Sequence, residues 1–253
     1  MRNRLLCNSF ETKEIVSYEK WKSYCWYINC GSCHRHRAYC GAYDILRETG
    51  GYQRNNSDFR ANAKNWAETY ATYNEWYEDT PGFYRTTVGQ ECTNFVSACV
   101  SKGGLVERWG TDQSDISKWY YEGEIILGWR HNISSHTWTL ASAFAKHWGH
   151  DEKGVGNQRA YKTIVYYCGE DALTDWNYLY NNLYNGDVVQ MFDADGVHHS
   201  MIVYNDVAST SYGSTDILLA QHTNNEKNKS LRAIFLKYSG ASNQEGFIIH
   251  RIK

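Results

Sequence analysis

A short helical pattern that starts at a cysteine constrains the fold of this chain more than any other stretch. Four apolar residues recur there at helical spacing, namely Phe95, Val96, Cys99 and Val100. The pair Gly103-Gly104 is a strong helix stop signal, so the pattern predicts a short, largely buried helix with Cys92 in its first turn. Unpaired backbone N–H groups and the positive end of the helix dipole lower the pKa of a thiol at that position.

Cys92 has two interpretations. Most lone cysteines are small buried apolar residues, and a position at a helix start does not by itself change that. With a histidine nearby, however, a thiolate in this position is the nucleophile of a cysteine hydrolase. The later stretch 187–223 favours the second interpretation, because it predicts strands that carry histidines.

Residues 187–223 predict three consecutive strands. The three segments are rich in β-branched or other apolar residues and span 188–192, 199–204 and 216–222. Period two places His199 on one face of the second strand and His198 on the opposite face. A histidine at the start of one strand and another at the end of the next antiparallel strand can be neighbours. His199 would then act as a base, and His222 would hold its ring in one tautomer.

Together these segments resemble the putative amidase domain family, within the papain-like group that also contains the NlpC/P60 cell-wall peptidases. The matching pieces are Cys92–Ser97, Gly186–Gln190, His199–Val203, Leu219–Asn224 and Asn228–Leu231, with weaker matches at Ser134–Trp138 and Phe59–Tyr70. The resemblance covers about residues 59 to 253. Two positions depart from the family pattern, since Glu91 stands where the family usually has Asp and Asn185-Gly186 where it usually has Pro-Gly. Neither departure removes the chemistry.

The resemblance implies an α+β, papain-like (NlpC/P60-like) fold in which a central antiparallel sheet packs against the helix that carries the cysteine. It implies a cysteine amidase or peptidase that cleaves amide bonds, with peptidoglycan stem peptides of a bacterial wall or another peptide as substrate. In this reading Cys92 is the nucleophile, His199 the base and His222 the third, orienting residue. Trp138 precedes a helix that lies near the active-site cleft in the family. The candidate residues of the substrate groove are Gln90, Asn94, Trp138 and Gln221.

The predicted reaction needs an oxyanion donor and no metal. The backbone N–H of Cys92 is a natural donor, and the side chains of Gln90 and Asn94 are the nearest candidates beside it. Gln221 and Asn224 are also close enough to His222 in sequence to orient a ring in its place. Period two puts Gln221 and His222 on opposite faces, so only one of them can point at His199. Activity is expected to resist chelators.

A non-catalytic module on the same fold, which binds a glycan or peptide, is the alternative function. The chain has 21 Tyr, 10 Trp and 8 Phe, and such side chains suit grooves that hold sugars or extended peptides. Residues 105–133 are rich in Trp and Tyr and predict an irregular segment that either walls a groove or folds over the core as a surface loop. A dedicated peptidase that processes one specific polypeptide is a further alternative.

Residues 1–58 predict a cysteine-rich helical appendage before the catalytic domain of residues 59–253. Four of its cysteines are closely spaced: Cys25, Cys30, Cys33 and Cys40. The spacing is compatible with a structural zinc, with two disulfides, or with incidental thiols on a helical segment. The run 49–57 is polar and contains glycines, which predicts a linker.

Net charge and hydropathy argue against nucleic acid and membranes as partners. The net charge of −2 gives no reason to expect binding to nucleic acid or to an anionic membrane. No apolar run approaches 18 residues, so no membrane-spanning helix is predicted. The first residues do not make a complete signal peptide. A cytoplasmic location, a mature or engineered fragment and export by another route therefore stay open, the family resemblance favours a secreted or cell-wall location, and the oligomeric state is not predicted.

Overall fold

A computed structural model describes residues 54–73, 91–126, 129–207, 215–240 and 245–253 of the chain. Its centre is a six-stranded sheet in the order β3-β8-β4-β5-β6-β7, and every neighbouring pair is antiparallel. The strands are β3 (Lys162–Tyr166), β4 (Val188–Asp193), β5 (Gly196–Val207), β6 (Asp216–Gln221), β7 (Glu226–Ser230) and β8 (Gly246–Arg251). The domain is therefore of the α+β class.

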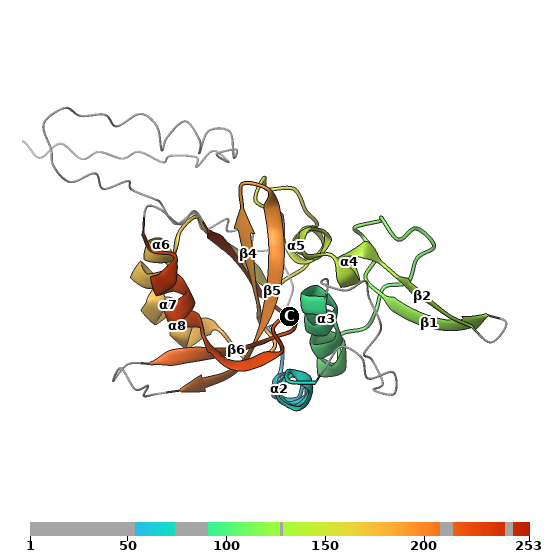
Figure 1. Ribbon diagram of the computed structural model, residues 1–253, viewed down its shortest axis with the longest axis horizontal. Coiled ribbons are helices and arrows are strands. Elements are labelled where there is room, and N and C mark those ends of the chain that lie inside the picture. Colours follow the sequence, from blue (N-terminus) through green and yellow to red (C-terminus); the bar gives the residue numbers. More distant parts are fainter. Residues whose placement is uncertain (1–53, 74–90, 127–128, 208–214, 241–244) are drawn as a thin grey trace, which may run out of the picture. The chain divides into compact units, whose positions relative to one another are not determined.

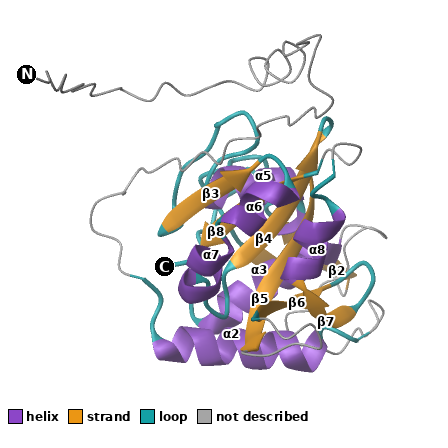
Figure 2. Ribbon diagram, turned by 90° about the vertical axis from the view of Figure 1, so that its left-hand side faces the viewer, coloured by secondary structure: helices purple, strands orange, loops and turns teal. Residues whose placement is uncertain are grey.

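Helices cover both faces of this sheet (Figures 1 and 2). One face carries α2 (Ser57–Tyr70), α3 (Glu91–Gly103), α4 (His136–Thr139) and α5 (Ala141–Trp148), and the other carries α6 (Gly169–Thr174), α7 (Trp176–Asn182) and α8 (Leu231–Lys237). Strand β4 shows why the arrangement follows from the sequence. Val188 packs in the cluster of the first face and Val189 in that of the second, so a continuous apolar run is buried on both sides.

The helix predicted at Cys92 is α3, and residues 91–100 within it are all buried. It packs against α2 and against β5, the strand that holds His199. The three predicted strands occur as β4, β5 and β6, with β5 extended to Val207. The hairpin between β4 and β5 turns at residues 194–195 and continues at Gly196, whose φ of 115° is one that L side chains rarely adopt.

Residues 105–133 contain more regular structure than predicted. Strands β1 (Tyr121–Ile126) and β2 (Trp129–Ser134) form a two-stranded antiparallel hairpin. The side chains of Trp119 and Tyr120, which precede it, lie in the core and do not wall a groove. Further along the chain, α6 and α7 are two separate short helices, with Asp175 between them.

The segment before α2 belongs to this domain. Arg54 donates from Nη1 to Oδ1 of Asp187 at 2.7 Å and to the carbonyl of Ile252 at 2.6 Å, and its Nη2 pairs with the other carboxylate oxygen. The carboxylate of Asp187 also accepts the backbone N–H of Tyr184 and of Ile252. Residues 54–58, which the sequence assigned to the appendage, are thus joined to the sheet. Among the described helices none is long and apolar enough to cross a membrane.

Candidate active site

Helix α3 and strand β5 bring Cys92 and His199 together. Cys92 lies in the first turn of α3 and is 5% exposed. Its sulfur is hydrogen-bonded by the imidazole of His199 and by the backbone N–H of Ser200, the next residue on β5. The hydroxyl of Thr93 lies 3.7 Å from the same sulfur. Two residues far apart in sequence therefore form one hydrogen-bonded pair at the start of a buried helix.

The pKa values of the two groups shift in opposite directions. Burial raises the pKa of the Cys92 thiol, but the hydrogen bond and positive charge of His199, together with Thr93 and Ser200, lower it below its ordinary value. Burial lowers the pKa of His199, but the hydrogen bond and negative charge of Cys92 raise it above its ordinary value. Shifts of these signs favour a thiolate beside an imidazolium over a neutral thiol beside a neutral ring.

Gln221, at the end of β6, holds the ring of His199. Nε2 of His199 lies 2.8 Å from Oε1 of Gln221, and because an amide oxygen only accepts, the ring nitrogen donates. Nε2 is therefore committed to Gln221, which leaves Nδ1 for the sulfur of Cys92. This is the tautomer that a base needs in order to take the thiol proton.

His222 does not hold the ring, and the prediction that it does is wrong. Its Nε2 is 3.0 Å from the carbonyl oxygen of Tyr70, and its ring stacks on Phe95 with centroids 4.3 Å apart. Burial lowers the pKa of His222 to about 4, so the ring is neutral at pH 7. As period two requires, Gln221 and His222 point to opposite faces, and Gln221 is the one that faces His199.

A buried row of polar side chains runs from Cys92 into the sheet. The hydroxyls of Thr93 and Ser200 are 2.9 Å apart, and Nε2 of Gln190 donates to the Ser200 hydroxyl at 2.8 Å. His250 in turn donates from Nε2 to Oε1 of Gln190 at 2.8 Å. The Ser200 hydroxyl accepts from Gln190, so it can donate its own proton to the hydroxyl of Thr93. The hydroxyl of Thr93 can then donate to the sulfur of Cys92. The row thus aims its donors at the thiolate.

Two predicted groove residues are structural. Trp138 is 2% exposed, and its indole N–H donates to Oδ1 of Asn94 at 2.8 Å. Asn94 is also buried and donates from Nδ2 to the carboxylate of Glu91 at 3.1 Å. These side chains support the first turn of α3 from within, so the prediction that they line a substrate groove is wrong. Gln221 is fully buried and contacts the ring, and Gln90 lies outside the described residues.

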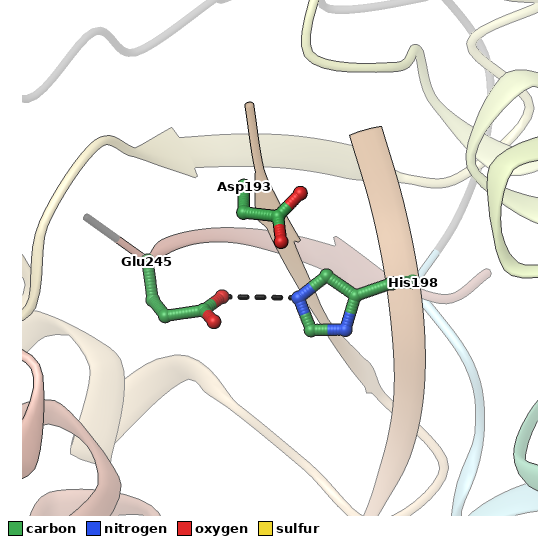
Figure 3. A group of neighbouring side chains, drawn as sticks. All are labelled: Asp193, His198 and Glu245. Carbon is green, nitrogen blue, oxygen red and sulfur yellow. Dashed lines mark hydrogen bonds and ion pairs between the residues drawn. The ribbon is translucent and has the colours of Figure 1, made fainter. Parts of the chain in front are cut away.

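In the described part of the chain, one group of side chains could hold a metal ion (Figure 3). Ligand atoms of Asp193, His198 and Glu245 lie within 4.8 Å of one another. Nε2 of His198 is 3.0 Å from the Glu245 carboxylate, and this contact accounts for two of the three side chains being close together. His198 lies on the face of β5 opposite His199, so the group is separate from the Cys92 site. The N-terminal cysteines proposed for zinc lie outside the described residues.

The comparisons with known proteins agree with the motifs in the sequence. The model of the putative amidase domain family matches residues 56–247, and the chain therefore belongs to this family. Membership makes the protein a hydrolase that acts on amides in general. No curated protein and no solved structure gave a match.

Gln221 was one of the predicted alternatives to His222, whereas Thr93, Ser200 and Gln190 were not predicted to be neighbours of the site. Their positions held a usable signal. Thr93 follows the cysteine directly, Ser200 follows the histidine directly, and Gln190 pairs with Ser200 across β4 and β5. Polar residues inside strands that are otherwise apolar and buried must find partners, and here the partners lead to Cys92.

Replacing Gln221 is expected to slow the alkylation of Cys92, whereas replacing His222 is expected to leave it nearly unchanged. Gln221→Met keeps the volume but removes the acceptor, so Cys92 should react with iodoacetamide about tenfold more slowly at pH 6. His222→Phe keeps the stacking on Phe95 and should leave that rate within about twofold, while the lost hydrogen bond to Tyr70 lowers stability by about 1 kcal/mol. Alkylation rates and thermal melting of both variants check this. Loss of Cys92 reactivity in His222→Phe alone would restore the original assignment.

Proposed function

We propose that this protein is a cysteine amidase or peptidase with a papain-like fold, and that Cys92 is its nucleophile. One observation carries the proposal. The sulfur of Cys92, at the start of a buried helix, is hydrogen-bonded by a histidine on the adjacent sheet, and the two pKa values are shifted toward an ion pair. A buried structural thiol has no such partner, and Cys99 on the same helix illustrates the contrast, because burial raises its pKa well above the ordinary value.

The first half of the reaction is acyl transfer to sulfur. The thiolate of Cys92 attacks the carbonyl carbon of the amide, and the carbonyl oxygen becomes an oxyanion that the backbone N–H of Cys92 is proposed to stabilise. The Nδ1–H of the His199 imidazolium then protonates the amide nitrogen as the C–N bond breaks. The products are a free amine, a thioester on Cys92 and a neutral imidazole.

The second half is hydrolysis of the thioester. Neutral His199 takes a proton from water at Nδ1, and the water oxygen attacks the thioester carbon. Collapse of the intermediate releases the carboxylic acid and restores the thiolate and imidazolium. Throughout both halves Gln221 accepts from Nε2, so the ring keeps one orientation. All groups in this scheme belong to the chain, and EDTA is expected to leave the activity unchanged.

Peptide amides, with peptidoglycan stem peptides as the first choice, are the proposed substrates. The support is the resemblance of the motifs around Cys92, His199 and Gln221 to the group that contains cell-wall peptidases. The alternative of a non-catalytic binding module relied on an aromatic groove. Trp119, Tyr120 and Trp138 are buried, so these three side chains do not line such a groove.

Alkylation against pH tests the nucleophile without a substrate. Because the pKa of Cys92 is lowered, alkylation of the Cys92 peptide by iodoacetamide, followed by mass spectrometry, is expected to slow less between pH 8 and pH 6 than alkylation of a model thiol. A model thiol slows by about tenfold for each pH unit below its pKa, because only the thiolate reacts. The same digest reports Cys168, a half-buried thiol of the same chain, as an internal comparison. Parallel pH profiles for Cys92 and a model thiol would remove the main support for the enzyme.

Purified peptidoglycan tests the substrate. Incubation with the wild-type protein should release new amino groups, whereas Cys92→Ala should release none, with or without EDTA. Absence of Cys92-dependent products, together with a reactive Cys92, would exclude the wall substrate and leave amide hydrolysis of another peptide standing.

A further inference from the structure

We propose that Glu226 and Lys229, on strand β7, are positioning residues that keep the side-chain amide of Gln221 turned with its oxygen toward His199. This inference rests on the proposed function, because the orientation matters only if His199 serves Cys92. It adds two charged residues to the machinery of the site, neither of which touches the reacting atoms.

Both ends of the Gln221 side-chain amide contact charged side chains, and these two side chains also contact each other. Oε1 of Gln221 accepts from His199 at 2.8 Å and from Nζ of Lys229 at 3.3 Å. Nε2 of Gln221 donates to Oε2 of Glu226 at 3.4 Å, and the same carboxylate oxygen lies 3.3 Å from Nζ of Lys229. The amide thus has the ammonium beside its oxygen and the carboxylate beside its nitrogen.

Charge, and not shape, decides which end of an amide faces a neighbour. The oxygen and nitrogen ends of Gln221 are nearly identical in size, so packing cannot distinguish the two orientations. A half turn of the amide would point its N–H₂ at the ammonium of Lys229 and its oxygen at the carboxylate of Glu226. It would also offer two donors to His199, whose imidazolium form has only donors of its own. The two charges therefore select the orientation that supports the ion pair with Cys92.

The hairpin between β6 and β7 is built to hold these groups in place. Gln221 and Glu226 are direct partners across the two strands. Three residues of this segment have positive φ values although none is glycine: Thr223 at 87°, Asn225 at 41° and Asn228 at 64°. Backbone strain of this kind is concentrated at functional segments, and the β-branched Thr223 is a costly residue for it.

The charged and titratable groups around the ring come from two elements. Cys92 approaches from α3, where the neighbouring Glu91 carboxylate accepts from Asn94. Lys229 and Glu226 approach from β7, and His222, next to Gln221, contacts the carbonyl of Tyr70 on the opposite face. The positive charge of Lys229 lowers the pKa of His199, and the adjacent carboxylate of Glu226 offsets that charge. Changing both residues together therefore alters the orientation of the amide with little net change in charge.

Exchanging the two charges tests the inference. Glu226→Lys combined with Lys229→Glu retains an ion pair and the net charge, but it places the carboxylate near Oε1 of Gln221 and the ammonium near Nε2. The side-chain amide of Gln221 should then rotate by a half turn, which points its N–H₂ at His199. We expect iodoacetamide to alkylate Cys92 at pH 6 at least about tenfold more slowly than in the wild type, since the ion pair loses its support. Nitrogen NMR of the His199 ring should show a proton on both nitrogens in the wild type and loss of the proton from Nε2 in the exchanged variant.

Three further variants serve as controls. Lys229→Arg keeps a cationic donor, and Lys227→Met removes the same charge from the same strand, where Nζ contacts the carbonyl of Glu68 at 3.3 Å. Both should alkylate within about twofold of the wild type. The neutral pair Glu226→Gln with Lys229→Met leaves the amide without a preferred orientation, and Cys92 should react about threefold more slowly. This pair decides the question if thermal melting shows that the exchanged variant does not fold.

The outcomes separate this inference from the function on which it rests. Wild-type alkylation rates in the exchanged variant, or in the neutral pair if the former does not fold, with the ring proton on Nε2, would show that Glu226 and Lys229 form an ordinary surface ion pair. The inference would then be wrong while the nucleophile stands. A wild-type Cys92 that reacts like a model thiol would overturn both.

Discussion

Replacing His199 with alanine is expected to slow Cys92-dependent amide hydrolysis by about a thousandfold or more. In the proposed mechanism the ring supplies the proton for the leaving amine, takes a proton from water and stabilises the thiolate, so one substitution removes three contributions. General acid–base catalysis alone is worth about a hundredfold to ten-thousandfold. The residual activity depends on binding and on the oxyanion donor, which His199→Ala leaves in place.

The same variant should reverse the direction in which the pKa of the Cys92 thiol is shifted. Burial raises the pKa of Cys92, and the largest opposing contributions are the hydrogen bond and charge of His199. Without the ring, burial dominates and the folded protein holds a protonated thiol at pH 7. Alkylation of Cys92 in His199→Ala is therefore expected to be negligible at pH 6 and to increase only as the pH rises above the ordinary thiol pKa.

A neighbouring histidine gives a matched control. His198→Ala removes an identical ring one residue earlier on β5, from the opposite face, where it pairs with Glu245. It should leave both the hydrolysis rate and the alkylation profile of Cys92 unchanged. Equal losses in the two variants would mean that the strand is disturbed as a whole, and the specific role of His199 would be rejected.

The sequence predicted the elements of the site because each carried an unambiguous local pattern. Apolar residues at helical spacing, stopped by two glycines, allowed only a short buried helix at Cys92. Runs of β-branched and aromatic residues between turn residues defined β4, β5 and β6, and alternation placed His199 apart from His198. Once the strands are antiparallel neighbours and the helix packs on one of them, the meeting of Cys92 and His199 is a consequence of topology.

The third member of the site could not be assigned in this way. Counting faces from His199 to Gln221 requires an unbroken register, but the pairing shifts between Val203 and Asn205 on β5 and between Leu219 and Gln221 opposite β7. Each shift changes which side chain faces the partner strand. By its chemistry alone a histidine is then the better candidate for the partner of His199, but in the folded protein His222 faces away from His199 and stacks on Phe95.

The prediction that Trp138 lines a groove was wrong for a different reason. An indole with one polar atom fits equally well in a wet groove and in a core that offers one acceptor. The acceptor is Asn94, three residues after Glu91, and nothing in the spacing of Asn94 and Trp138 along the chain indicates that they meet. Burial of large amphipathic side chains is decided by tertiary partners, which local patterns do not record.

Removing the carboxylate of Asp187 is expected to destabilise the domain by about 3–5 kcal/mol. Asp187 is fully buried and accepts from the guanidinium of Arg54 and from the backbone N–H groups of Tyr184 and Ile252. Asp187→Ala leaves the largely buried cation of Arg54 without its counter-charge, which is the costly way to break a buried ion pair. Urea or thermal unfolding measures the loss.

A double-mutant cycle separates the ion pair from simple loss of packing. Removing both charges, with Arg54→Met and Asp187→Ala together, should cost less than the sum of the two single losses, because neither charge is then left buried alone. Asp195→Ala, at the exposed tip of the β4–β5 hairpin, should change stability by less than about 0.5 kcal/mol. Additive losses in the cycle would show that Arg54 and Asp187 contribute independently.

The cycle also tests the domain boundary predicted from the sequence. If the losses are additive, a chain that begins at residue 59 should lose little stability. If the two residues are coupled, the domain needs Arg54 for its stability.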